Sequence, residues 1–311
     1  HALVVAELIL EKALALAWQH TAALYGEPRC EEGGRARTAR VAIAGYGKLG
    51  GMELGYASDL DLVFLHDSAG ERQFTTGPKV VENEVYFLRL AQRLAHLLTV
   101  HTAAGRLYEV DVRLRPSGKG GLAFTQVGGF EEYQRHEAWT FEHQALLHSR
   151  WVAGSARLGA AYARVRRAVL AEAVRRERLR EDILAMRERM RAEHGKPREG
   201  QFDLKHDRGG IADIEFLAQY WVLRDVHRYP PLAEFADTIR HLESVGSAAL
   251  VDHRVIDRLV DAYRAYRQAA HHLSLEQRPP IVEAGAYAAM RAQVAAIWDP
   301  VMVAGADPAP G

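Results

Sequence analysis

The stretch Ser58-Asp59-Leu60-Asp61-Leu62-Val63-Phe64 places two aspartates, one residue apart, at the start of an apolar run. A short apolar run of this kind favours a strand, in which residues i and i+2 point to the same face. We therefore expect both carboxylates to project together. Neighbouring carboxylates repel each other, and a bound cation relieves the repulsion; ligands that are all oxygen favour Mg²⁺ or Mn²⁺. The alternative is an edge strand with two solvated acids.

A glycine-rich turn, Gly45-Tyr46-Gly47-Lys48-Leu49-Gly50-Gly51, precedes this stretch and follows a predicted buried strand at residues 40–45. Its G-x-G-x-x-G spacing, with Asp67 further on, resembles a dinucleotide-binding Rossmann unit. However, a parallel crossover needs a helix of about ten residues or more, and only residues 51–58 are available. We favour a glycine turn and a short helical turn whose backbone N–H groups hold phosphates, with Lys48 as a nearby positive charge.

A third carboxylate lies on a second predicted strand. Residues 106–116 alternate strictly between polar and apolar side chains, which predicts a half-buried strand. This polar face is either an exposed edge with internal ion pairs or a partner of Asp59 and Asp61 that adds a carboxylate and arginines for a triphosphate. This face consists of Leu107 and the polar residues Glu109, Asp111, Arg113 and Arg115.

The remaining sequence is mostly helical in pattern. Residues 1–25 and 80–100 predict helices, residues 68–81 a loop, and residues 122–125 a short strand. From residue 130 to residue 194 the propensity is helical. Within it, the charged run from Arg175 to Arg191 alternates arginines with acids and is typical of a solvated helix face.

A second glycine pair lies in the segment Phe202–Phe216, where Gly209-Gly210 leads into a predicted helix. Asp213 and Glu215 fall in its first turn, which suits the positive end of a helix. The functional alternative is a second contact with nucleotide, in which Lys205 reaches a phosphate.

Composition limits the classes of function. Lys+Arg and Asp+Glu are equal at 40 each in 311 residues, so the net charge gives no argument for binding nucleic acid. The single cysteine, Cys30, excludes an internal disulfide and a thiolate zinc site, and it fits a reducing cytoplasm. No apolar stretch has the length of a membrane span and no leader is recognisable. Because the first residue is His1, we expect a fragment.

Four motifs carry a family likeness. The run from Gly45 to Leu62 resembles the nucleotidyltransferase signature of glutamine synthetase adenylyltransferases, within the polymerase-β-like superfamily. The segments 107–118 (LeuTyrGluValAspValArgLeuArgProSerGly), 137–146 (GluAlaTrpThrPheGluHisGlnAlaLeu) and 202–216 resemble the same family in the same order. The segment GluLeuGlyTyrAlaSerAspLeuAspLeu (53–62) is similar to the corresponding segment in the C-terminal, adenylylating half of that two-part enzyme.

The resemblance implies a fold and a domain organisation. It implies an α+β chain with a small mixed nucleotidyltransferase sheet and flanking helices, followed by an all-α helical bundle. We place the nucleotidyltransferase domain, with its N-terminal helix, at residues 1–129 and the helical domain at residues 130–311.

The resemblance also implies a reaction, in which AMP passes from ATP to a tyrosine hydroxyl of glutamine synthetase and pyrophosphate leaves. Asp59, Asp61 and Asp111 would hold two Mg²⁺ ions, with Asp111 also a candidate base and Glu109 the reserve carboxylate. The residues expected to contact nucleotide are Gly47, Lys48, Gly50, Gly51, Ser58, Arg113, Arg115 and Lys205.

Partners and alternative functions follow from the same likeness. A PII-type signalling protein and the missing half of the polypeptide are the expected partners besides glutamine synthetase, with no nucleic acid and no membrane. Three alternatives stay open: the deadenylylating half of the enzyme, a uridylyltransferase of a regulatory protein, and a non-catalytic module that binds nucleotide or PII.

Overall fold

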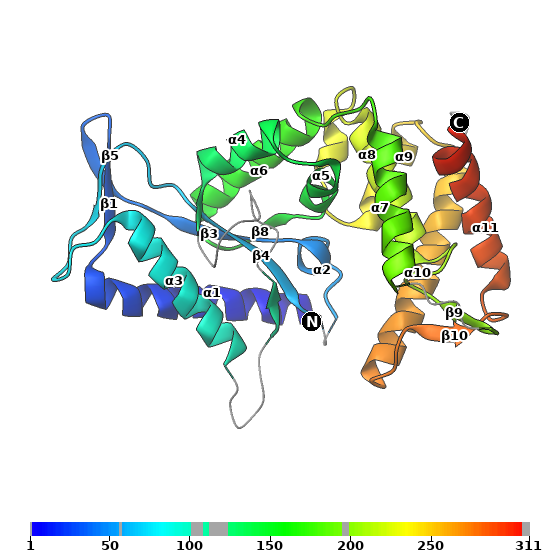
Figure 1. Cartoon of the computed structure of the whole chain (residues 1–311), viewed down its shortest axis with the longest axis horizontal. Helices are drawn as coiled ribbons and strands as arrows, with labels where there is room; N and C mark the ends of the chain where they lie inside the picture. Colours follow the sequence, from blue (N-terminus) through cyan, green and yellow to red (C-terminus); the bar gives the residue numbers. More distant parts are fainter. Residues whose placement is uncertain (1, 56–57, 101–107, 112–123, 195–198, 307–311) are drawn as a thin grey trace. The chain divides into compact units, whose positions relative to one another are not determined.

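The computed structural model describes residues 2–55, 58–100, 108–111, 124–194 and 199–306. Contacts divide the chain into two compact units. The first comprises His1–Ala138 with His148–Val169, and the second comprises Trp139–Leu147 with Leu170–Gly311 (Figure 1). The division at residue 129 stays a prediction about domains.

A mixed sheet forms the centre of the first unit. Its strand order is β6-β4-β3-β8, and β7 pairs with β4 as well. β3 is antiparallel to β4 and β8, whereas β6 and β7 are parallel to β4. This arrangement confirms the α+β class with a small mixed sheet. Because β3 and β4 are antiparallel, the Rossmann alternative is excluded. The strands are β3 (Val41–Gly45), β4 (Leu60–His66), β6 (Val110–Asp111), β7 (Thr125–Gln126) and β8 (Arg150–Gly154).

Strand β8 corrects the prediction that residues 130–194 are helical throughout. It lies between two helices and pairs with β3, more than a hundred residues earlier in the chain. The strand is only five residues long and lies between helical segments, so its short β-type run decides little, and long-range pairing with a buried strand determines it.

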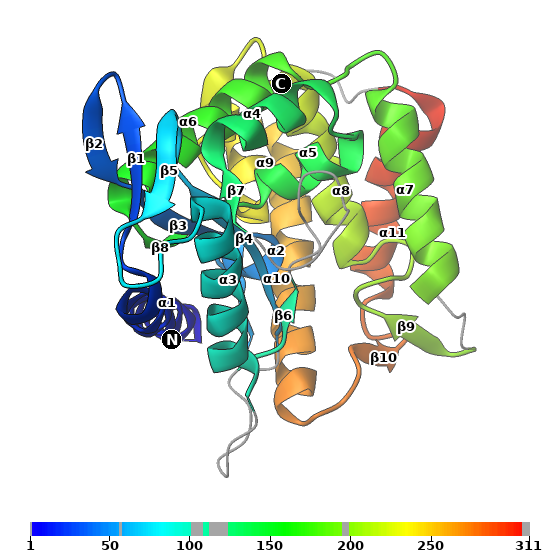
Figure 2. The same ribbon diagram turned by 60° about the vertical axis from the view of Figure 1, so that its left-hand side comes forward.

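A second, three-stranded sheet has the order β2-β1-β5, formed by β1 (Pro28–Glu32), β2 (Arg35–Thr38) and β5 (Glu71–Thr75) (Figure 2). Gly33 and Gly34 link β1 to β2 with φ of 58° and 74°, the left-handed conformation that a two-residue hairpin turn requires. β5 corrects the prediction that residues 68–81 are only a loop. Its pairing with β1 is again a long-range effect.

Helices α1 (Ala2–Tyr25) and α3 (Asn83–Thr99) pack against each other in the first unit and confirm the two predicted helices. Trp18 and Tyr86 meet edge to face between them, with ring centroids 5.5 Å apart. Their buried residues form one core with the apolar side chains of β3 and β4. The other helices of this unit are α2 (Gly47–Gly50), α4 (Val127–His136) and most of α6 (Ala156–Glu172).

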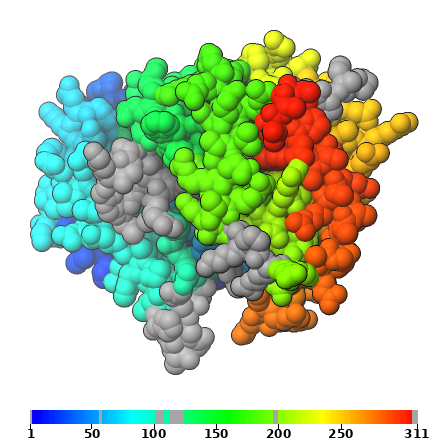
Figure 3. All heavy atoms as spheres, turned by 45° about the vertical axis from the view of Figure 1, so that its right-hand side comes forward, coloured from blue at the N-terminus to red at the C-terminus, as the bar shows by residue number. Residues whose placement is uncertain are grey.

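The second unit is largely helical, as predicted, and adds a two-stranded antiparallel sheet of β9 (Gln201–Asp203) and β10 (Ile281–Glu283). Helices α7 and α11 both lie at the surface of the second unit (Figure 3). Among the described residues, no helix combines the length and apolar character needed to cross a membrane. The helical elements of the second unit are α5 (Thr140–Leu147), α7 (Leu179–His194), α8 (Ile211–Asp225), η1 (Pro230–Ala233), α9 (Thr238–Ser247), α10 (His253–Leu275), α11 (Ala288–Trp298) and η2 (Asp299–Ala304).

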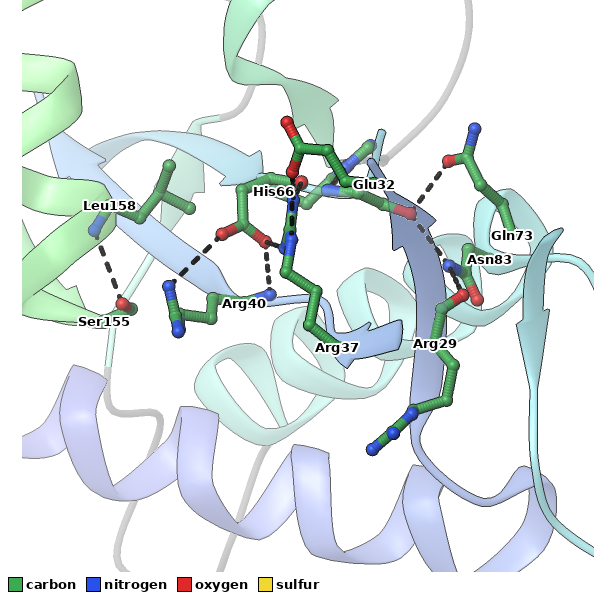
Figure 4. Close-up of polar contacts among 11 residues, drawn as sticks. Arg29, Glu32, Arg37, Arg40, His66, Gln73, Asn83, Ser155 and Leu158 are labelled. Carbon is green, nitrogen blue, oxygen red and sulfur yellow. Dashed lines mark hydrogen bonds and ion pairs between the residues drawn. The ribbon is translucent and has the colours of Figure 1, made fainter. Parts of the chain in front are cut away.

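An ion-pair cluster ties the hairpin of β1 and β2 to the end of β4 (Figure 4). The Arg37 guanidinium donates to Asp67 Oδ1 at 3.0 Å and to Glu32 Oε2 at 3.1 Å. The backbone N–H of Arg40 also donates to Asp67 Oδ1, at 2.6 Å. Asp67 is therefore engaged in holding the hairpin, at the end of β4 away from the aspartate pair.

His66, on β4, gives the fold a pH dependence. Burial lowers the pKa of His66 to about 4, although the nearby Asp67 opposes this. Its Nδ1 accepts the backbone N–H of Ser68 at 3.1 Å, and its ring stacks on Phe87. Because the unfolded state takes up the proton at a pKa near 6.5, the stability from neutral His66 is present above that pH and is lost as the pH falls towards 4.

We therefore expect the protein to lose up to about 3 kcal/mol of unfolding free energy through His66 between about pH 7 and pH 4. Urea unfolding of the wild type and of His66→Gln at both pH values measures this contribution. Glutamine does not titrate, so the variant should show a smaller loss over the same range. Equal losses in the two proteins would contradict the assignment.

Candidate nucleotidyl-transfer site

The register of β4 and β6 brings two of the three predicted carboxylates together. Asp61 is the second residue of β4, and it is the direct partner of Asp111 in the parallel pair. Neighbouring strands lie about 4.8 Å apart, so paired residues project side by side from one face. Both residues are half-buried. Asp59 comes just before β4 and is exposed, two positions from Asp61.

The backbone keeps the edge of the sheet paired at this point. The N–H of Leu60, the first residue of β4, donates to the carbonyl oxygen of Glu109 at 2.8 Å, and Glu109 directly precedes β6. The reserve carboxylate, Glu109, is exposed. Figure 2 shows β6 beside β4.

Helix α2 begins against Asp61. The N–H of Tyr46 donates to the carbonyl oxygen of Asp61 at 2.9 Å, and the helix starts at the next residue, Gly47. Gly47 has a φ of 52°, and a Cβ built on it would overlap Oδ2 of Asp61. Glycine is favoured at this position, because a side chain would strain the backbone and would push the Asp61 carboxylate aside.

We expect Gly47→Ala to lower the free energy of unfolding by about 1–2 kcal/mol from the backbone conformation, and to displace the Asp61 carboxylate in addition. Gly55→Ala in the same loop is the matched control, because its Cβ would meet only Ser58 Oγ, at an ordinary 3.5 Å. Chemical unfolding of the two variants measures the difference. A similar stability for both would show that Gly47 is not constrained.

The other glycines of the turn have structural roles. The N–H groups of Gly50 and Gly51 donate within the turn, to the carbonyl oxygens of Tyr46 (3.0 Å) and Gly47 (2.8 Å). A Cβ on Gly50 would overlap the carbonyl oxygen of His148. In the part of the chain that the structure describes, the Gly47 amide is not used in this way, so it is the best placed of the three for a phosphate.

Two further predicted contacts lie in or near this turn. Lys48 is half-buried in the last turn of α2. Ser58 precedes the aspartate pair, and its Oγ accepts the N–H of Gly55 at 3.2 Å. Arg113 and Arg115 lie outside the described residues.

Strand β8 supplies a residue that the sequence did not indicate. Arg150, at its start, donates to the carbonyl oxygen of Leu49 at 3.2 Å, at the C-terminal end of α2, and forms an ion pair with Glu7 of α1. A cation at this end of a helix is favourable. The signal available in the sequence was the short β-type run that follows Arg150 and ends at Gly154.

A buried hydroxyl chain fixes the residue before α2. Tyr162 of α6 is hydrogen-bonded to Tyr46 (3.0 Å) and to Ser149 (2.6 Å). Burial, followed by the neighbouring Tyr162, raises the pKa of Tyr46 well above its usual value. Both tyrosines therefore stay protonated, and they anchor the glycine turn from the side of β8 and α6.

In the second unit, the loop before α8 is organised by its own acids. Asp203 Oδ1 accepts the backbone N–H groups of Lys205 (2.8 Å) and His206 (3.0 Å). Asp207 Oδ2 accepts the N–H of Asp203 at 2.9 Å. The side chain of Lys205, the predicted phosphate contact, is exposed.

Asp213 lies in the first turn of α8, as predicted, and its carboxylate holds the loop before the helix without capping the N-cap residue Gly210. Its Oδ2 accepts the N–H of Gly209 at 2.6 Å, and its Oδ1 accepts Nε of Arg187 at 2.7 Å. Both side chains are fully buried. Arg187 thus corrects the prediction that the Arg175–Arg191 run is only a solvated face, because one arginine of this run turns inward to a buried acid.

The donor atoms at the β4–β6 edge are suited to a hard cation. Asp61 and Asp111 offer carboxylate oxygens only, and glycine at position 47 leaves room for Oδ2 of Asp61 where a Cβ would overlap it. Within the described ranges, however, no three His, Cys, Asp or Glu side chains are gathered closely enough to form a metal site. Two carboxylates suit Mg²⁺, which usually completes its coordination with water and substrate phosphates.

Comparison with known families agrees with this geometry. The profile described as glutamate-ammonia ligase adenylyltransferase matches residues 2–165, which include the glycine turn, the aspartate pair and β8. The chain belongs to this family. The matched range also includes Glu7, Ser149 and Tyr162, which support the turn. Residues 177–279 match a second profile, described as PII-uridylyltransferase.

Two curated relatives of the glutamate-ammonia ligase adenylyltransferase family cover nearly the whole chain. The bifunctional glutamine synthetase adenylyltransferase/adenylyl-removing enzyme of Thioalkalivibrio sulfidiphilus (strain HL-EbGR7) is 48% identical over 301 residues, 97% of this chain and 31% of the relative. The enzyme of the same name from Nitrosococcus oceani is 44% identical over 302 residues, with the same coverage. The chain thus spans about a third of the length of these relatives.

Proposed function

We propose that this chain is the adenylylating part of a bifunctional enzyme that moves AMP from ATP to a tyrosine hydroxyl of glutamine synthetase. The observation that carries the proposal is the pairing of Asp61 with Asp111 next to Gly47, in a chain of this family. Transfer of AMP from ATP to a hydroxyl needs carboxylates that can hold metal ions beside backbone amides that can hold phosphate oxygens.

We assign Asp59, Asp61 and Asp111 as ligands of two Mg²⁺ ions. Support comes from the all-oxygen donors and from the strand register that joins Asp61 to Asp111. Asp59 is exposed and just outside β4, so it can swing towards Asp61 without breaking strand pairing. Bound Mg²⁺ would supply charge neutralisation for the phosphates and a lower pKa for the attacking hydroxyl.

The chain's own groups then have separate roles. The tyrosine oxygen of the substrate protein attacks the α-phosphorus of ATP in line, the bond to the bridging oxygen breaks, and pyrophosphate leaves. Asp111 is the candidate acceptor of the phenol proton, whose pKa starts near 10. Gly47, through its amide, and Lys48 would hold phosphate oxygens, and Gly50, Gly51 and Ser58 would keep the turn in place.

Arginines and one lysine complete the proposed phosphate site. Arg113 and Arg115 follow Asp111 in the sequence and would offset the charge of the triphosphate. Lys205 is an exposed cation of the second unit and is the weaker candidate for a phosphate contact.

The direction of the reaction rests on sequence. The segments GluLeuGlyTyrAlaSerAspLeuAspLeu (53–62) and TrpThrPheGluHisGlnAlaLeu (139–146) resemble the adenylylating half more than the removing half. The names of the relatives include both adenylylation and removal of the adenylyl group, so they do not decide between the two halves. The assignment of this chain to the adenylylating half is therefore our proposal.

The decisive experiment is mass spectrometry of glutamine synthetase after incubation with this chain, ATP and Mg²⁺. An added AMP on one tyrosine would establish reaction, donor and acceptor together, and EDTA should prevent it. Starting instead from adenylylated glutamine synthetase tests the removing half. Loss of AMP there, with no addition in the first assay, would overturn the assignment.

A second candidate is a uridylyltransferase, which the match of residues 177–279 to the PII-uridylyltransferase profile favours. The two candidates use different donors and acceptors. Comparing ATP with UTP, and glutamine synthetase with a PII-type protein, as substrates of the same preparation separates them. UMP on the PII-type protein and no AMP on glutamine synthetase would favour the second candidate.

Partners and compartment follow from the proposed reaction. Glutamine synthetase is the substrate, a PII-type protein is the proposed regulator, and the rest of a longer polypeptide is the proposed covalent neighbour. We place the reaction in the cytoplasm, because Cys30 is a free, buried thiol and suits a reducing compartment.

A further inference from the structure

Helix α1 is apolar on two opposite faces. Its inner face packs on α3 and β8, and its outer face is exposed. The buried residues of the inner face are Ala6, Leu10, Ala13, Leu14, Ala17 and Thr21. What we call the outer face consists of Val4, Val5, Leu8, Lys12, Ala15, Leu16 and Gln19, which recur at helical spacing.

The outer face is unusually apolar for a helix surface in water. The side chains of Leu8, Val4 and Leu16 are 65%, 57% and 46% exposed. Lys12 is the one charged residue of this face, and exposed Glu11 at its edge accepts the N–H of Gly154 at 2.7 Å. A helix that is apolar all round is normally buried all round, because leaving such residues in water gives up hydrophobic stabilisation.

Helix α10, of almost the same length, shows the contrast. Its buried residues are apolar or aromatic, and its exposed side is polar throughout its first half. It has the amphipathic pattern of a helix that faces solvent. Its exposed residues there are His253, Arg254, Asp257, Arg258, Asp261 and Arg264.

No described element of the first unit covers the outer face. Within that unit, Figures 1 and 2 show α3 and the sheet on one side of α1 and no element on the opposite side. The curated relatives are about three times as long as this chain, which accounts for 31% of their length. A polypeptide of that length has ample further structure with which to cover one helix.

We propose that the outer face of α1 is the surface on which another part of the same longer polypeptide packs. The occupant is apolar where it meets Val4, Leu8 and Leu16. This inference rests on the proposal that the chain belongs to a longer polypeptide, and it is independent of the reaction that the chain catalyses.

The single cysteine allows a direct test by thiol labelling. Cys30 is buried, so the native chain gives a low background. Leu8→Cys and Leu16→Cys place one reactive thiol each on the outer face, and Asp261→Cys on the exposed side of α10 is the control. Each is made in this chain and in the polypeptide encoded by the complete gene, and the labelling rates are compared.

We expect the two outer-face thiols to react roughly tenfold more slowly or slower still in the complete polypeptide, whereas the α10 thiol changes little. Equal rates at Leu8→Cys in both proteins would overturn the proposal. So would slow labelling in this chain alone that depends on its concentration, because a second copy would then be the occupant. The assay needs no enzymatic activity, so failure of the proposed reaction does not affect it.

A second pair of variants covers the possibility that a cysteine disturbs packing. Leu8→Glu with Leu16→Glu should leave the melting temperature of this chain unchanged, because both positions face water there. In the complete polypeptide the same double variant should melt several degrees lower, because it places two charges in an apolar contact. An unchanged melting temperature in both proteins would contradict the proposal.

Discussion

Asp61→Asn should lower the rate of AMP transfer to glutamine synthetase by about a thousandfold or more and leave the fold intact. Asparagine keeps the shape of the side chain next to Gly47 but removes the charge and one anionic oxygen. A metal-supported transfer draws several kcal/mol of its transition-state stabilisation from this charge, and about 4 kcal/mol corresponds to a thousandfold. Initial rates with labelled ATP measure the effect, and urea unfolding of each variant confirms that the fold is kept.

The strand β6 provides a matched comparison for the third carboxylate. Asp111 pairs with Asp61, whereas Glu109 lies two residues earlier and is exposed. Asp111→Asn should reduce transfer nearly as much as Asp61→Asn, and Glu109→Gln should reduce it by less than about threefold. The reverse order would make Glu109 the third ligand. Near-normal transfer by Asp61→Asn or by Asp59→Ala would refute the metal-site proposal.

The strand that carries Asp61 could be predicted because it depends on local rules: its apolar run indicates a strand, and the short gap after the glycine turn argues against a crossover helix. Asp59 lies just before β4, so a shared face for the two carboxylates stays a prediction. The structure agrees, with an antiparallel β3–β4 pair and a mixed sheet. The positive φ and close packing of Gly47 belong to the same local segment.

What the sequence did not indicate depends on contacts between distant residues. Arg150 reaches Leu49 across 101 positions, and the hydroxyl of Tyr162 reaches Tyr46 across 116. No periodic pattern encodes such pairs. The proposed ligand Asp111 could be predicted in part. The alternating pattern of the sequence predicts its strand, but only the folded sheet gives the register that pairs Asp111 with Asp61.

The charged run of α7 illustrates how a correct helix prediction can miss the role of one residue. Alternating arginines and acids are typical of a solvated face, and most of this run is exposed or half-exposed. Arg187 belongs to the same pattern but points inward, because its partner Asp213 lies 26 residues further on. The position of that acid in space, rather than the local pattern, decides the environment of Arg187.

This buried pair leads to a strong prediction about stability. Arg187→Met should lower the free energy of unfolding by about 3–5 kcal/mol, because it leaves the fully buried carboxylate of Asp213 without its main partner. The guanidinium also donates to the carbonyl oxygen of His206 at 2.8 Å, which then loses its donor. Arg191 lies 3.5 Å from the same oxygen of Asp213 but is about a quarter exposed, so it compensates only in part.

Two further variants distinguish the effect of an unpaired buried charge on stability from the effect of losing any arginine. Arg189→Met removes an exposed arginine from the same helix and should change stability by less than about 0.5 kcal/mol. Asp213→Asn retains an oxygen that can accept the N–H of Gly209 while removing the charge. The double variant Arg187→Met with Asp213→Asn should therefore be more stable than Arg187→Met alone, since no unpaired charge is buried. If the double variant loses the full sum of the two single losses in urea unfolding, then the two side chains are not coupled and the loop before α8 is held by its backbone caps instead.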